Sequence, residues 1–182
     1  KTSKYWSEVT NGVVVINPEA IAEQLEAAKA QVAAAKAAGK EILVVCEKKM
    51  YAEELEALAA KAGVAFLNYK VSGGFLTNFD TFKKRIDSIN EMVSFMETDA
   101  FASLTKKEQL VYKRNFERAN KVYKGVTKLK KRPELVIIVD GNMLSTLIDE
   151  VENLKGKLEA IVIAGTNFSR YWSENEIITT NI

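Results

Sequence analysis

Short apolar runs alternate with longer helical stretches along most of the chain. Five strand-sized runs rich in Val, Ile and Leu occur, at residues 12–17, 42–46, 64–69, 135–140 and 160–164. Nearly continuous apolar character is typical of strands buried on both faces, as in a parallel sheet. Helical stretches separate the first three runs and the last two. The pattern therefore predicts an α/β fold: a parallel sheet of about five strands with helices on both faces.

The ends of the predicted helices carry recognisable signals. Asn17 is suited to cap a helix that has Pro18 at its first position. Gly39 is suited to end that Ala-rich helix. A second helix is predicted at about residues 50–62 and a third at about 143–154.

Residues 81–132 follow a different pattern. Apolar side chains recur at alternating intervals of four and three in two successive stretches: Phe82, Ile86, Ile89, Val93 and Met96, then Tyr112, Phe116, Ala119, Tyr123 and Val126. This is the spacing of coiled-coil seams. Thr105 followed by Glu108 predicts a capping box that opens the second helix, with residues 98–104 as the turn. We expect an inserted antiparallel coiled-coil hairpin at 81–132, in a sheet domain made of residues 1–80 and 133–182; packing of both stripes on the main core is the alternative.

Charge is divided unevenly between these parts. The chain has 26 Lys plus Arg and 24 Asp plus Glu, a net charge of only +2. Residues 80–132 hold 14 of the basic and 7 of the acidic residues (net +7), which leaves 12 and 17 (net −5) for the remainder. Dense positive charge on a projecting element favours binding to a phosphate backbone. A solvated coiled-coil surface is the alternative.

The residue types present exclude most hydrolytic and metal chemistry. The chain has no His, so it has no Ser-His-Asp triad, Cys-His dyad or His-ligated zinc site. Cys46 is the single Cys, which excludes an internal disulfide and indicates a buried thiol in a reducing compartment. The chain lacks a phosphate-loop motif, and the turn at residues 16–19 lacks the glycines of a dinucleotide site. We expect no catalytic site, metal or cofactor.

The apolar runs also bear on location. None approaches the ~20 residues of a membrane span, and the first eight residues have no apolar signal core. We therefore expect a cytoplasmic protein without a membrane partner. Because the chain begins at Lys1 rather than Met, we expect a further segment before it.

Residues 70–86 carry a specific motif, Lys-Val-Ser-Gly-Gly-Phe-Leu-Thr-Asn-Phe-Asp-Thr-Phe-Lys-Lys-Arg-Ile. It resembles the second family of bacterial small-subunit ribosomal proteins, which has R-W-x-G-G-x-L-T-N-F immediately before its coiled-coil hairpin. The matching residues are Gly73, Gly74, Leu76, Thr77, Asn78, Phe79 and Thr81. Residues 11–16, 48–49, 133–140 and 166–167 match further family motifs in order. The chain departs from the family pattern at Lys70-Val71, Gly141 and Gly165, where the family has Arg-Trp, Pro and Asp.

The resemblance implies a flavodoxin-like sheet with strand order 2-1-3-4-5 and a structural role in translation rather than catalysis. It implies contact with small-subunit rRNA and with other small-subunit ribosomal proteins, including the large RNA-capturing first small-subunit protein. It implies no small-molecule substrate.

Most phosphate contacts are then expected from basic residues, because such contacts position a protein without base recognition. In and beside the insert these are Lys83, Lys84, Arg85, Lys106, Lys107, Lys113, Arg114, Arg118, Lys121, Lys124, Lys128, Lys130, Lys131 and Arg132. Lys1 and Lys4 are expected to add an N-terminal arm, and the motif adds Lys70, Gly73, Gly74, Thr77 and Asn78. Gly73 and Gly74 are expected to let the backbone approach RNA closely. Tyr5 and Trp6 are suited either to stack on bases or to join the core.

Two other classes of function stay open. A small-ligand-binding α/β enzyme would need a crevice at the carboxyl ends of the strands, near Glu47, Ser72, Asp140 and Thr166. Asp140 is equally explained as a helix cap. A non-ribosomal scaffold would use the helical hairpin as a protein-binding coiled coil.

Overall fold

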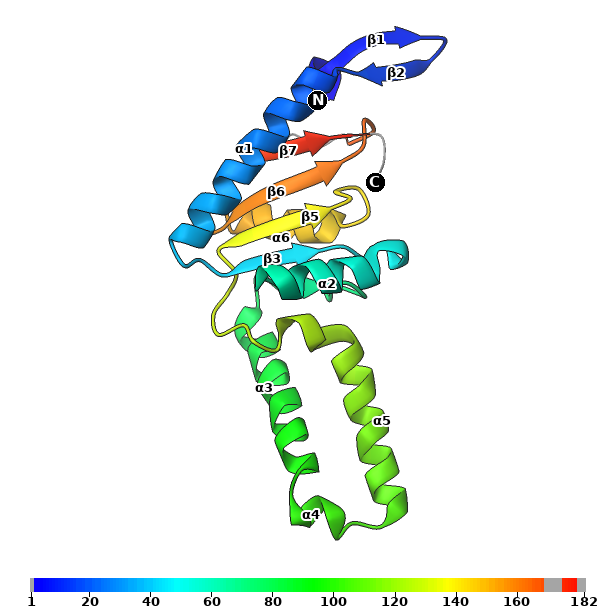
Figure 1. Cartoon of the computed structure of the whole chain (residues 1–182), viewed down its shortest axis with the longest axis vertical. Helices are drawn as coiled ribbons and strands as arrows, with labels where there is room; N and C mark the ends of the chain where they lie inside the picture. Colours follow the sequence, from blue (N-terminus) through cyan, green and yellow to red (C-terminus); the bar gives the residue numbers. More distant parts are fainter. Residues whose placement is uncertain (1, 169–174, 180–182) are drawn as a thin grey trace.

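A five-stranded parallel sheet forms the centre of the molecule. The computed structural model describes residues 2–168 and 175–179. The strands are β3 (Ile42–Val45), β4 (Ala65–Leu67), β5 (Leu135–Val139), β6 (Glu159–Ala164) and β7 (Asn175–Ile178), in the order β4-β3-β5-β6-β7, and every neighbouring pair is parallel (Figure 1). Numbered along the chain within this sheet, the order is 2-1-3-4-5, which agrees with the implied order.

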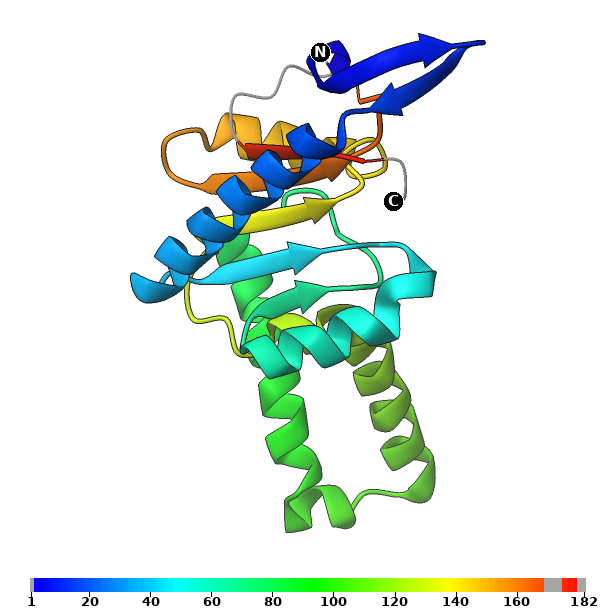
Figure 2. The same cartoon turned by 45° about the horizontal axis from the view of Figure 1, so that its top comes forward.

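Helices cover both faces of the sheet, as predicted. On one face Ala28 and Ala35 of α1 (Pro18–Ala37) pack with Ile161 of β6. On the other, Leu147 of α6 (Ser145–Asn153) packs with Val162, because neighbouring residues of a strand point to opposite faces. The shorter helix α2 (Ala52–Ala62), preceded by the 3-10 turn η2 (Lys49–Tyr51), packs beside the edge strand β4 (Figure 2).

The local signals at the start of α1 are confirmed. Asn17 Oδ1 accepts a hydrogen bond from the backbone N–H of Glu19 at 3.0 Å, and Pro18 is the first helical residue. This cap satisfies one of the N–H groups that a helix start leaves unpaired.

The prediction that the first apolar run, residues 12–17, belongs to the main sheet is wrong. After the 3-10 turn η1 (Thr2–Tyr5), β1 (Trp6–Thr10) and β2 (Val13–Ile16) form a separate two-stranded antiparallel hairpin (Figure 1). Asn11 and Gly12 make its turn, both with positive φ (52° and 78°), the backbone that tight hairpins need. β-branched residues fit a pleated hairpin as well as a buried strand, so composition alone did not separate the two. The fifth place in the main sheet is taken by β7, which was not predicted.

Two long helices project beyond the sheet. They are α3 (Phe79–Met96) and α5 (Lys106–Tyr123), joined through the short helix α4 (Asp99–Ala102), and η3 (Lys124–Val126) leads back to the sheet (Figures 1 and 2). The predicted capping box is present: the Thr105 side chain accepts from the Glu108 N–H, and the Glu108 carboxylate accepts from the Thr105 N–H at 2.9 Å. The predicted turn at 98–104 contains α4.

The apolar stripe of α3 is divided along its length. Phe82 and Ile86 are buried in the main core with the sheet, whereas Val93 is 40% exposed. Packing on the main core, the alternative to a separate coiled-coil seam, is thus correct for the first half of α3. Toward the tip, Phe95, Phe101 and Tyr112 form a separate cluster with ring centroids 5.2–5.9 Å apart. The two ends of the helix pair are therefore held by different sets of side chains.

Candidate nucleic-acid interface

The Gly-Gly motif forms the loop between β4 and α3, at the carboxyl end of β4. Phe75 and Leu76 are 1% and 0% exposed, so they anchor the loop in the core. Thr77 and Asn78 are exposed beside them. Gly74 has a φ of 85°, a conformation that favours glycine, and its carbonyl accepts from the Asn78 N–H at 2.7 Å.

Glu150 of α6 lies beneath this loop and is only 6% exposed. Its Oε1 accepts from the Gly74 N–H at 2.6 Å. Its Oε2 accepts from the N–H groups of Leu76 (2.8 Å) and Thr77 (3.1 Å), and from the Thr77 hydroxyl at 3.4 Å. Several backbone N–H groups that converge on one point are an anion-binding arrangement, and here the anion is a carboxylate of the chain itself.

This contact changes how the loop can meet RNA. The Gly74 and Thr77 amides are used inside the protein, so phosphate contacts by those amides are not available. Gly73 and the side chains of Lys70 and Asn78 are exposed at the surface, and so is Thr77, although its hydroxyl donates to Glu150. Their contact with RNA stays a prediction. The sequence contains one signal that could have identified Glu150. It is a charged residue that flanks the apolar positions of the helix predicted at about residues 143–154.

Basic side chains gather on one face of α5. Lys107, Arg114 and Arg118 are exposed and are seven and four residues apart, which places them on the same side of a helix. The apolar stripe with Tyr112 and Phe116 lies on the opposite side. Lys106 and Lys113 flank the basic residues and are exposed. We call Lys107, Arg114 and Arg118 the α5 basic face.

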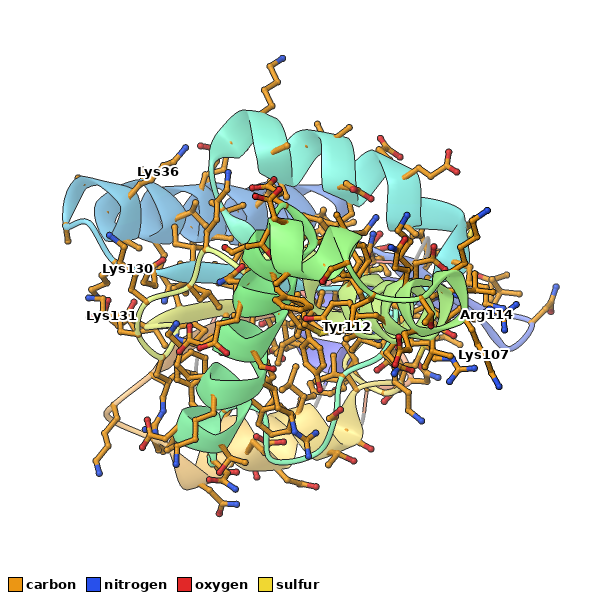
Figure 3. All side chains as sticks on the ribbon, turned by 90° about the horizontal axis from the view of Figure 1, so that it is seen from below. Lys36, Lys107, Tyr112, Arg114, Lys130 and Lys131 are labelled. Atoms are coloured by element: carbon orange, nitrogen blue, oxygen red, sulfur yellow. The ribbon has the colours of Figure 1, made fainter. Side chains whose placement is uncertain are left out.

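A second basic group lies in the segment that follows η3. Figure 3 shows Lys130 and Lys131 beside Lys36, on the opposite side of the molecule from Lys107 and Arg114. Lys128 and Lys130 are exposed. Arg132 is half-buried, and its Nε has no hydrogen-bond partner among the described residues. The positive charge of the insert is therefore split between two surfaces.

Other predicted RNA-binding residues make contacts inside the protein. Ion pairs join Lys83 to Asp87, Lys124 to Glu56, and Lys131 to Glu134. The pKa of the Glu134 carboxyl is lowered, chiefly by the hydrogen bond from Lys131 and to a smaller extent by the hydrogen bond from the Glu41 N–H. Arg85 lies over the Phe82 ring (5.5 Å) and Lys121 over the Tyr69 ring (4.4 Å). Lys84 is exposed.

The start of the chain is tied to the sheet through Glu176 of β7. Its carboxylate accepts from the Tyr5 hydroxyl at 2.8 Å and pairs with Lys4 at 3.2 Å. The pKa of Lys4 is raised, chiefly by its hydrogen bond with Tyr5 and to a smaller extent by its pairing with Glu176. Burial raises the pKa of Tyr5. Tyr5 is half-buried against the main core. Lys1 lies outside the described residues.

The comparisons with known proteins agree with the motif. The family model for ribosomal protein S2 matches residues 1–178. The chain belongs to the ribosomal protein S2 family. The expectation drawn from the Gly-Gly motif is thereby confirmed.

Two relatives named small ribosomal subunit protein uS2 illustrate the similarity. The one from Coprothermobacter proteolyticus is 34% identical over 144 residues, which is 79% of this chain and 54% of the relative. The one from Francisella tularensis subsp. holarctica is 31% identical over 164 residues, 90% of this chain and 69% of the relative. This member of the S2 family therefore matches about half of one relative and about two thirds of the other. Both relatives are named as proteins of the small ribosomal subunit.

Two of the residues that the enzyme alternative requires, Glu47 and Asp140, make contacts inside the protein in this S2-family chain. A cleft of about 200 Å³ is lined by Glu47, Ser72 and Glu150, among others. Glu47 accepts from the Val71 N–H at 2.7 Å, so Glu47 and Glu150 both already accept hydrogen bonds from backbone N–H groups. Asp140 pairs instead with Lys48 at 3.1 Å and accepts from the Met143 N–H.

The described residues offer neither a metal cluster nor a membrane span. No group of three or more Cys, Asp or Glu side chains in this part of the chain could hold a metal ion. Among the same residues, no helix is both long and apolar enough to span a membrane. Cys46 is buried with a free thiol, as predicted.

Proposed function

We propose that this chain is a structural constituent of the small ribosomal subunit in the cytoplasm, where it binds small-subunit rRNA without catalysing a reaction. Family membership supports the ribosomal role. The observation that supports RNA contact is the charge division: residues 80–132 have a net charge of +7 and the remainder has −5. Exposed basic side chains of these residues lie both on the α5 basic face and in the segment that follows η3.

The binding mechanism is electrostatic. Exposed Lys and Arg side chains displace counterions from rRNA phosphates, which makes the affinity strongly salt-dependent. Structured RNA is recognised by shape more than by base sequence, so the two basic surfaces are suited to different RNA segments. The projection of α5 from the sheet allows this contact, while the sheet domain contacts RNA through the loop at residues 70–78.

The remaining parts have separate roles in this proposal. Residues 81–132 act as the inserted coiled-coil hairpin, and residues 1–80 and 133–182 as the α/β domain. The acidic α/β domain faces protein partners, namely other small-subunit ribosomal proteins and the large RNA-capturing first small-subunit protein. The net charge of −5 outside residues 80–132 supports this, because it disfavours RNA contact over most of the domain, away from the loop at residues 70–78.

The test is co-sedimentation of the tagged chain from lysate on a sucrose gradient, over a salt series, with and without RNase. The expected result is migration with the small ribosomal subunit and release after RNase treatment or high salt. Migration as free protein under every condition would overturn the proposal and favour the small-ligand enzyme. Migration in a complex that RNase leaves intact would favour the protein-binding scaffold instead.

A further inference from the structure

We infer that Glu150 and Glu47 are positioning residues: their carboxylates bind backbone N–H groups of the loop at residues 70–78 and fix the surface that this loop presents to RNA. We call these two carboxylates the clamp. The inference rests on the proposed function. It adds two acidic residues to a binding mechanism otherwise built on Lys and Arg, and neither carboxylate belongs to the family motif from which the loop was recognised.

The two carboxylates hold the loop near its two ends. Glu47 follows β3 and accepts from the Val71 N–H at 2.7 Å, where the loop begins. Glu150, on α6, accepts from Gly74, Leu76 and Thr77, where the loop ends. Hydrogen bonds to an ionised acceptor are the stronger kind, so four backbone N–H groups are held by two charges. The loop is thus fixed to α6 and to the segment that follows β3, which are distant in sequence from each other and from the loop.

The clamp also acts on the helix that follows. Asn78 is the N-cap position of α3, and its N–H donates to the carbonyl of Gly74, the same residue whose N–H is held by Glu150. A shift of Gly74 would therefore move both the exposed Thr77–Asn78 pair and the start of α3. Since α3, α4 and α5 follow in sequence, the clamp bears on how the basic helices leave the sheet.

The direction of the change in RNA affinity distinguishes this positioning role from a simple charge effect. A carboxylate near bound RNA repels phosphates, so removing its charge normally strengthens binding. If Glu150 positions the loop, its replacement by Gln has the opposite effect. In the Glu150→Gln variant the amide oxygen can serve the three donors at the Oε2 position, while the side-chain NH₂ group then faces the Gly74 N–H, which loses its acceptor.

The experiment compares wild type with Glu150→Gln, Glu47→Gln and the control Glu152→Gln in the full chain. Glu152 is an exposed residue of α6, so the control makes the same charge change on the same helix. Two quantities are measured: affinity for deproteinised small-subunit rRNA by filter binding, and hydrogen exchange of individual amides. Because Glu47 holds one N–H and is only half-buried, Glu47→Gln carries the test if Glu150→Gln does not fold.

The expected results differ in sign. Glu150→Gln binds rRNA at least about threefold more weakly and Glu152→Gln binds as tightly as wild type or more tightly. Exchange accelerates about tenfold or more at Gly74 in Glu150→Gln, and at Val71 in Glu47→Gln, with the β5 amides unchanged. Equal affinity of Glu150→Gln and Glu152→Gln would overturn the role in RNA binding, and unchanged exchange at Gly74 would overturn the clamp itself.

Failure of the proposed function is recognised separately. If wild type itself does not bind rRNA, the proposed function falls and with it the role of the clamp in RNA binding. Hydrogen exchange in the variants still decides whether the two carboxylates hold the loop.

Discussion

Gly125 lies directly against Phe66. A Cβ atom on Gly125 would be 2.2 Å from the Phe66 carbonyl oxygen and 2.7 Å from two atoms of its ring. Gly125 is part of η3, which returns the chain from α5, and Phe66 is the middle residue of the edge strand β4. This backbone contact closes the base of the helix pair against the sheet, and it leaves no space for a side chain.

Gly125→Ala is therefore expected to lower the free energy of unfolding by about 2 kcal/mol or more, because backbone atoms must move to admit the methyl group. Urea denaturation of both proteins measures this difference. Gly73→Ala is the matched control: its new Cβ would lie 3.8 Å from Thr146 Cγ2, an ordinary contact, and a change within about 0.5 kcal/mol is expected. Equal effects of the two substitutions would contradict the close approach at Phe66.

Thr105→Ala should weaken the start of α5. The Thr105 side chain caps the Glu108 N–H, and loss of such a cap costs about 1 kcal/mol. The measurement is urea denaturation combined with hydrogen exchange at the amides of residues 105–109. Thr105→Ser keeps the capping oxygen and should stay near wild type. If Thr105→Ser were as destabilised as Thr105→Ala, the methyl group rather than the cap would matter.

The pH dependence of stability should include a contribution from Glu159. Hydrogen bonds from Gln31 and then Lys40 lower the pKa of its carboxyl below the ordinary 4.5. The folded state thus favours the carboxylate, so the stabilisation is fully present above that ordinary value and is lost as pH falls through the lowered one. Between about pH 5 and pH 3, wild type should lose more stability than Glu159→Gln. Parallel stability curves for the two proteins would rule this contribution out.

The α5 basic face can be tested by the triple substitution Lys107→Gln, Arg114→Gln and Arg118→Gln. Three lost phosphate contacts should weaken rRNA binding about tenfold or more at low salt and reduce the salt slope by about two. Filter binding over a salt series measures both.

A charge-matched control uses three exposed lysines outside residues 80–132: Lys61, Lys155 and Lys157. Their replacement by Gln removes the same net charge and should leave the salt slope close to wild type, because the slope counts phosphates in contact rather than total charge. Equal slopes for the two triple variants would show that α5 is not the contact surface.

Elements with strong local signals were predictable. The α1 cap at Asn17 and the capping box at Thr105 depend on side chains that bond to backbone within three residues, so neighbouring residues determine them. Four strands of the main sheet were recognisable because a continuous apolar run of strand length is hard to bury in any other way. The Gly-Gly motif likewise identified the family, because its matching residues lie close together along the chain.

The sheet that β2 joins and the sheet that β7 joins depend on their partner strands, which the local residue pattern does not indicate. Val13–Ile16 is as apolar as a central strand, yet it pairs with Trp6–Thr10 and leaves Val13 65% exposed. β7 contains Asn and Glu at its start and pairs with β6 at the sheet edge. Which strand pairs with which is decided by long-range packing, so similar compositions can reach different sheets.

The sequence by itself determined the alternation of strands and helices, the family and the uneven division of charge, because each of these is carried by neighbouring residues or by a count. Only the tertiary structure decided which residues meet: that Glu150, more than seventy residues away, holds the loop of Gly74, and that Gly125 lies on Phe66. The physical reason is that a buried carboxylate must find hydrogen-bond donors, and a close backbone contact must find an edge strand, wherever the folded chain brings them.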